Sequence, residues 1–162
     1  MNQNNIAGAP YPLILFDKEG KEHEFQSVAF SDRDLSALDN WVQSLVISNA
    51  RRYLKERIES TDPEESITQG QYDEELSLAF TASLEVSIYS PKGVVVLNTP
   101  AGAARLAWQM VQKHHPDVKY DTMVSFCRSV ENMTSVFRAS RILNDLEAKE
   151  EGDEGKNELR SA

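Results

Sequence analysis

The stretch SDRDLSALDNWVQSLVISNARRYLKERI, residues 31–58, decides the fold, because it predicts one long helix. Its apolar residues recur at helical spacing, beginning with Leu35, Leu38 and Val42. Ser31 is a suitable N-cap, and the acidic residues that follow it favour the positive end of the helix dipole. Basic residues gather near the other end, where the dipole favours cations.

Upstream of this helix, residues 11–30 predict a β-hairpin. The apolar run that ends at Phe16 is followed by a turn containing Gly20, and residues 24–30 then alternate roughly between apolar and polar. A hairpin on its own is marginally stable in water, so we expect this one to lie against helices. Residues 1–10 lack apolar periodicity and predict a flexible arm.

Downstream, residues 59–72 contain a proline, a glycine and several acids, and they predict a loop. The next segment, residues 73–90, supports two interpretations. Its apolar residues alternate strictly over 76–88, as in a strand, but the larger ones from Leu76 to Ile88 also form a row at helical i, i+4 spacing. We predict a helix over 73–90, because so many residues would make a long strand, and a strand remains the alternative.

The C-terminal half of the chain predicts further helices. Ser90 to Gly93 interrupts the preceding element, and residues 94–97 form a short β-prone run. Thr99 and Pro100 then mark a helix start, as an N-cap followed by proline at the first helical position. The helices predicted in this half span about 100–115, 119–128 and 130–147, and residues 148–162 predict a disordered acidic tail.

Length and composition fit one folded domain. The chain has 162 residues, 40% of them hydrophobic and 27% charged, which is typical of an ordinary folded chain. We therefore predict a single domain over 11–147. Its fold class is mainly α, a small helical domain with an N-terminal β-hairpin, and so α+β at the margin.

The net charge of −9 is unevenly distributed along the chain. Residues 56–75 hold eight acids and one base, for −7, and residues 145–162 hold seven acids and three bases, for −4. The rest of the chain is nearly neutral, at +2. Because nucleic-acid binding needs a basic face, we expect no nucleic-acid partner. We also expect no membrane partner, because no apolar run approaches the roughly 18–20 residues of a membrane span.

Cysteine usage and the N-terminus bear on where the protein works. The lone Cys127 excludes an intramolecular disulfide. Residues 1–10 have neither the basic start nor the apolar stretch of a signal peptide. These features predict a cytoplasmic protein, in the host cytoplasm if the protein is viral.

Few side chains suggest catalysis. Cys127 with His115 and Asp117 could form a nucleophilic site, but a buried structural cysteine is the commoner arrangement. His114 and His115 are adjacent, so on a helix they point about 100° apart and cannot easily share one metal ion. No phosphate-binding glycine motif is present. We predict no catalytic, cofactor-binding or metal-binding residue, and hence no enzyme and no cofactor.

The segment NTPAGAARLAWQMVQKHHPDV, residues 98–118, resembles a stretch in the tail assembly chaperones of long-tailed bacteriophages. In that family a helix start of small residues leads to Leu-x-Trp, here Leu106 and Trp108, and then to a basic His-Pro boundary and a short helix. The order upstream is also similar, with a hairpin-like start, a long helix that contains Trp41 and an acidic connector. The similarity covers about 30–145.

The resemblance implies a protein that is not part of the virion and that works by binding other proteins. It would keep tail tube subunits soluble during tail assembly and help to recruit them around the tape measure protein. In such systems a longer form is often made by ribosomal frameshifting near the C-terminus, which an acidic tail would accommodate.

Three residues are candidates for partner binding: Trp41, Trp108 and His115. Aromatic residues at helical spacing are usually part of a core, and only sometimes binding hot spots. Two other functions stay open: a structural component of a virion or another protein assembly, and a small enzyme that uses Cys127 with His115. The sequence leaves the oligomeric state undetermined.

Overall fold

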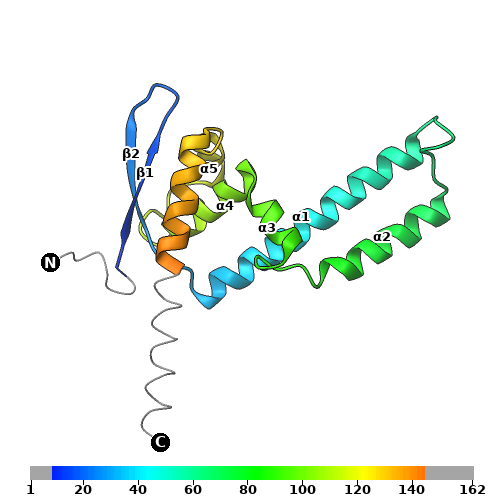
Figure 1. Ribbon diagram of the computed structural model, residues 1–162, viewed down its shortest axis with the longest axis horizontal. Helices are drawn as coiled ribbons and strands as arrows, with labels where there is room; N and C mark the ends of the chain where they lie inside the picture. Colours follow the sequence, from blue (N-terminus) through cyan, green and yellow to red (C-terminus); the bar gives the residue numbers. More distant parts are fainter. Residues whose placement is uncertain (1–8, 145–162) are drawn as a thin grey trace, which may run out of the picture. The chain divides into compact units, whose positions relative to one another are not determined.

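A computed structural model describes residues 9–144 of the chain, and these residues form a mainly helical structure with an antiparallel two-stranded hairpin at its start (Figure 1). The predicted fold class is therefore confirmed. The elements are β1 (Tyr11–Phe16), β2 (Glu22–Ser27), α1 (Asp32–Glu59), α2 (Gln69–Ser83), α3 (Pro91–Leu97), α4 (Pro100–Val111), α5 (Tyr120–Phe126) and a further helix described over 130–144. The predicted tail, most of the predicted arm and the end of the helix predicted to 147 lie outside the described residues.

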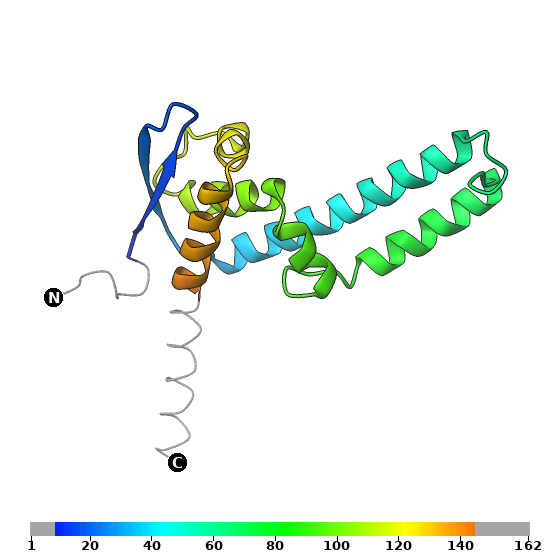
Figure 2. The ribbon, with the colours of Figure 1, turned by 45° about the horizontal axis from the view of Figure 1, so that its top comes forward.

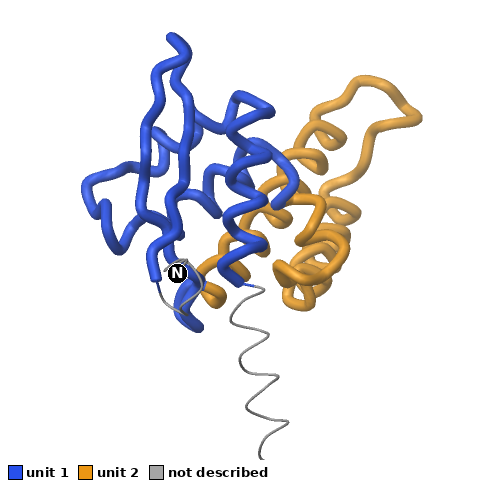
Figure 3. Tube along the Cα trace, turned by 60° about the vertical axis from the view of Figure 1, so that its left-hand side comes forward, with its two compact units in different colours: residues 1–34, 97–162 blue, residues 35–96 orange. Residues whose placement is uncertain are grey.

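The chain divides into two compact units, where the sequence predicts one domain (Figure 3). Unit 1 takes in residues 1–34 and 97–162, of which 9–34 and 97–144 are described, and unit 2 takes in residues 35–96. Within the described chain, no helix is both long enough and apolar enough to cross a membrane.

The hairpin of unit 1 packs by one face. Leu13 and Leu15 are buried, whereas Ile14 and Phe16 between and after them are exposed, as the alternation of a half-buried strand requires. The register pairs Tyr11 with Ser27 and runs to the pair of Phe16 with Glu22. Gly20 has a positive φ of 78° in the connecting turn, where a residue with a side chain would be strained.

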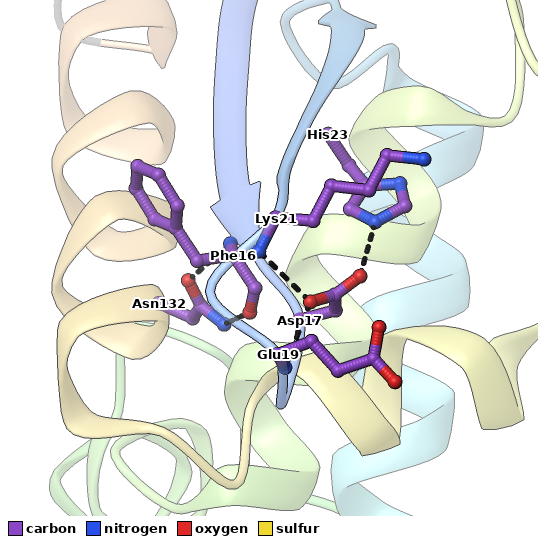
Figure 4. Close-up of polar contacts among 6 residues, drawn as sticks. All are labelled: Phe16, Asp17, Glu19, Lys21, His23 and Asn132. Atoms are coloured by element: carbon purple, nitrogen blue, oxygen red, sulfur yellow. Dashed lines mark hydrogen bonds and ion pairs between the residues drawn. The ribbon is translucent and has the colours of Figure 1, made fainter.

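Groups from the helical part of unit 1 bond to both edges of this hairpin. The backbone N–H of Phe16 donates to Oδ1 of Asn132 at 2.9 Å, and Nδ2 of Asn132 donates to the Phe16 carbonyl at 2.8 Å (Figure 4). On the β2 side, the Gln26 N–H donates to Nε2 of His115 at 2.8 Å, and the Val28 N–H donates to the Met110 carbonyl at 2.9 Å. The hairpin is thus held by backbone bonds as well as by buried side chains, as expected for one that cannot stand alone.

α4 provides much of the core of unit 1. The Thr99 hydroxyl accepts from the Gly102 N–H at 3.1 Å, and Pro100 is the first residue of the helix, so the predicted start is confirmed. Eight of its residues are buried, including Ala103, Ala104 and Ala107, whose small side chains allow close packing. The predicted ends are wrong: α4 ends at Val111 rather than 115, and α5 is shorter than the predicted 119–128.

Unit 2 is built on α1, which begins and ends within one residue of the predicted 31–58. α2 runs beside it in the opposite direction (Figures 1 and 2). The helix predicted over 73–90 exists, and the alternative strand is wrong, but its bounds are Gln69–Ser83. It starts early because Thr68 and Gln71 form a capping box, each side chain accepting from the other residue's backbone N–H.

The β-prone run at 94–97 lies in α3, a helix that the sequence prediction does not include. Ser90 Oγ accepts from the Gly93 N–H at 3.2 Å, and Pro91 opens the helix. A Cβ at Gly93 would lie 1.7 Å from the Ser87 carbonyl oxygen, so only glycine allows this close approach. The helix start and this packing override the β propensity of the valines.

Candidate protein-binding surface

The three predicted partner-binding residues do not form a described site. Trp108 and His115 lie in unit 1, and each has a structural contact of its own there. Trp41 is half-buried on α1 in unit 2. The partner-binding role of these residues therefore stays a prediction, and the contacts of the first two point to packing.

Trp108 bonds to the chain segment that follows α4. Its indole Nε1–H donates to the Val118 carbonyl at 3.0 Å. The Arg105 guanidinium lies 4.8 Å from the centre of its ring, and the Tyr120 ring meets it edge-on at 6.3 Å. Burial lowers the pKa of Arg105 and raises the pKa of Tyr120, as expected for groups drawn into an aromatic cluster.

His115, in the segment that follows α4, bonds to β2. Because its Nε2 accepts the Gln26 N–H, the neutral imidazole carries its proton on Nδ1. The ring also meets Phe25 edge-on, with centroids 5.5 Å apart. The acceptor nitrogen of this imidazole is therefore used in a bond within unit 1.

Cys127 is set up as a core residue. It is fully buried, and loss of solvation raises its pKa to about 11, so the thiol keeps its proton at neutral pH. Among the hydrogen bonds of the described residues, none joins its Sγ to an imidazole. Within residues 9–144, no three His, Cys, Asp or Glu side chains gather into a group that could hold a metal ion.

The hairpin turn holds the main polar cluster of unit 1. Asp17 accepts from Nε2 of His23 at 2.9 Å and from the backbone N–H groups of Glu19 and Lys21 (Figure 4). The bond from His23, followed by the bond from the Lys21 backbone, holds the pKa of the Asp17 carboxyl below its usual range. These bonds shape the turn. A hollow of about 520 Å³ lies beside it, between the turn and the end of α5, with Phe16 and Phe126 in its wall.

Unit 2 carries most of the exposed apolar side chains. Among the described residues, seven of the ten large exposed hydrophobic side chains lie in this unit: Tyr53, Leu78, Phe80, Leu84, Tyr89, Val94 and Val95. α2 itself buries only Ser83 completely, whereas α4 buries eight residues. Exposed apolar side chains gathered in one part of a protein are typical of an interaction surface.

Three of the apolar residues of α2 and its end form one row. Leu76, Phe80 and Leu84 follow each other at i, i+4 spacing, and Phe80 is 57% exposed and Leu84 61% exposed. A groove of about 350 Å³ runs along this side of α2, and its walls are Ile47, Arg51, Asp73, Leu76, Ser77 and Phe80. We call this row with its groove the α2 groove.

Leu78 lies on the opposite side of α2 and is 64% exposed. α2 is therefore apolar on two sides, which explains why its sequence matches both a helical row and a strand alternation. That double pattern is the signal in the sequence for an exposed apolar surface. The sequence prediction missed it by treating the two patterns as alternatives.

The connector between α1 and α2 is strongly acidic, as its −7 over 56–75 indicates. Its one described ion pair joins Arg57 to Glu75, at 3.4 Å, and Arg57 also donates to the Glu65 carbonyl. Unit 2 has ten acidic and five basic residues, for −5, whereas the described part of unit 1 has nine of each. The exposed apolar surface thus lies on the acidic unit.

Comparison of the chain with protein-family models, with curated proteins and with solved structures finds no match.

Proposed function

We propose that this protein is a non-catalytic binder of another protein, most specifically a tail assembly chaperone-like factor. The observation that carries the proposal is the α2 groove, where Phe80 and Leu84 are more than half exposed. A surface of this kind covers apolar side chains of a partner and so keeps that partner from associating with itself. The absence of an activated nucleophile at Cys127 is in keeping with a binding role.

The identity of the partner rests on the resemblance of residues 98–118 to the phage family. On that basis the client is a tail tube subunit, held soluble in the host cytoplasm until it is recruited around the tape measure protein. Neither nucleic acid nor membrane enters this role.

Co-expression with the tail tube subunit encoded beside this chain tests the proposal. We expect the wild-type protein to raise the soluble fraction of that subunit and to be recovered with it. The double variant Phe80→Ser/Leu84→Ser should lose both effects. Val130→Ser is the matched control, because Val130 is an exposed apolar residue of unit 1. If the subunit is equally insoluble with and without the wild-type protein, the proposed function is wrong.

A second candidate is a structural component of a virion or another assembly. The outer face of β1 favours it, since Ile14 and Phe16 are both exposed there and could lock onto a neighbour. Mass spectrometry of purified particles separates the two functions, because a chaperone is absent from the finished particle and a structural component is retained.

A further inference from the structure

We propose that the α2 groove binds an amphipathic helix whose polar face carries lysine and arginine. This inference rests on the proposed function and specifies the segment of the client that is recognised. It follows from two independent properties of unit 2, the shape of its apolar surface and the sign of its charge.

The shape favours a helix. α1 and α2 lie side by side, and two helices bury only the stripe along which they meet (Figure 2). The groove between them is lined by Ile47 from α1 and by Leu76 and Phe80 from α2. A third helix laid into such a groove buries its own apolar stripe and completes a three-helix arrangement, a common mode of peptide recognition.

The charge favours a cationic helix. Arg51 and Asp73 both border the groove, so the charges on its rim alone do not favour a helix of either sign. The charge preference comes from the surplus of acids in unit 2, net −5, and above all from the connector of residues 56–75, where Glu64 is exposed and its carboxylate makes no bond in the described chain. Lysine and arginine on the bound helix would be attracted to this field, and an acidic helix would be repelled.

A second copy of the chain is the competing occupant. Pairing two copies through this surface would bring together two units of net charge −5 each. Like charges that face each other across an interface are costly, and the cost grows as the salt concentration falls. The charge therefore favours a partner of opposite sign over self-association.

Three synthetic peptides of about 18 residues, roughly five helical turns, test this inference on the full chain. The first has leucine at helical spacing with lysine elsewhere, the second replaces every lysine with glutamate, and the third scrambles the first so that it has no apolar face. By fluorescence anisotropy, we expect the first to bind at least about tenfold more tightly than either of the others. Raising the salt from about 50 to about 300 mM should weaken that binding several-fold.

Two double variants show where the lysine peptide binds. Phe80→Ser/Leu84→Ser should weaken binding of the lysine peptide about tenfold or more. Glu64→Gln/Asp73→Asn, which neutralises one connector carboxylate and the carboxylate in the groove wall, should weaken it several-fold. The matched control for charge is Glu22→Gln/Glu131→Gln, which neutralises two exposed carboxylates of unit 1 and should leave the affinity unchanged. Circular dichroism checks that each variant is folded.

The outcomes separate this inference from the proposed function. Equal binding of the lysine and glutamate peptides, or no binding of either, overturns the cationic-helix inference. So does concentration-dependent dimerisation that Phe80→Ser/Leu84→Ser abolishes. If the client then still depends on Phe80 and Leu84 for its solubility, the proposed function stands without the charge preference.

Discussion

Asn132 is a single side chain that takes the place of a neighbouring strand. Asn132 is 1% exposed, and its carboxamide accepts from and donates to the two backbone groups of Phe16, as a paired residue of a third strand would. Its Nδ2 also donates to the Phe126 carbonyl at 2.8 Å, so it ties the hairpin to the end of α5 as well. No pattern in the sequence indicates this role, because the contact joins residues far apart in the chain.

Asn132→Ala should lower the free energy of unfolding by about 3 kcal/mol, because it leaves the part-buried backbone groups of Phe16 and the Phe126 carbonyl without this partner. Urea unfolding followed by circular dichroism measures the change. Asn40→Ala is the control, since Asn40 is exposed on α1, and it should change the stability by less than about 0.5 kcal/mol. Equal effects of the two variants would show that the Asn132 bonds contribute nothing special.

Cys127 should make the stability depend on pH in the alkaline range. Its folded pKa of about 11 lies above the ordinary value of 9.0, so the unfolded chain releases this proton first. The stabilisation is therefore fully present below about pH 9 and is lost as the pH rises towards 11. We expect the wild type to lose about 2 kcal/mol more than Cys127→Ala over this interval, measured by urea unfolding at each pH. Parallel pH profiles would contradict the burial of a protonated thiol.

At the scale of elements, capping signals locate the starts of helices better than residue propensities decide between helix and strand. Thr99 with Pro100 predicts the start of α4 correctly, and Ser90 with Pro91 is the same signal at α3. The sequence prediction treated Ser90 to Gly93 only as an interruption before four β-prone residues, and so it missed this second helix start. The approach of Gly93 to Ser87 is a tertiary contact, and no local pattern contains it.

Gly93→Ala and Gly70→Ala should have opposite effects on thermal stability. The new methyl group at 93 would meet the Ser87 carbonyl at 1.7 Å and force the backbone apart, so we expect a loss of about 2–3 kcal/mol. At Gly70, on α2, the nearest atom would be Thr68 Oγ1 at 3.9 Å, so alanine should stabilise the helix by about 0.5–1 kcal/mol. A destabilised Gly70→Ala or an unaffected Gly93→Ala would contradict this account.

At the scale of the whole molecule, the two units differ in how much of their helices is buried. The sequence predicts the fold class, the long α1 and the capped start of α4, because these depend on periodicity and caps. It does not predict the division into units or the exposed row on α2. Both depend on which apolar side chains the folded chain buries, and Phe80 and Leu84 stay more than half exposed.

Hydrogen exchange followed by mass spectrometry should distinguish the two units. Amides of α2 should exchange faster than those of α4, because local opening costs less where few side chains are buried. Peptides that cover 69–83 and 100–111 provide the comparison within one sample. Adding the client should slow exchange in the first region and leave the second unchanged. Equal protection of both helices in the free protein would contradict this prediction.

The bonds on the edges of the hairpin have a consequence for the behaviour of the protein at high concentration. An open strand edge is a template on which another chain can add a strand, and repeated addition leads to fibres. On β1, Pro12 lacks an amide hydrogen and the Phe16 groups are already bonded to Asn132. A protein that exposes an apolar row on α2 thus offers less foothold for fibril growth along this strand of its hairpin.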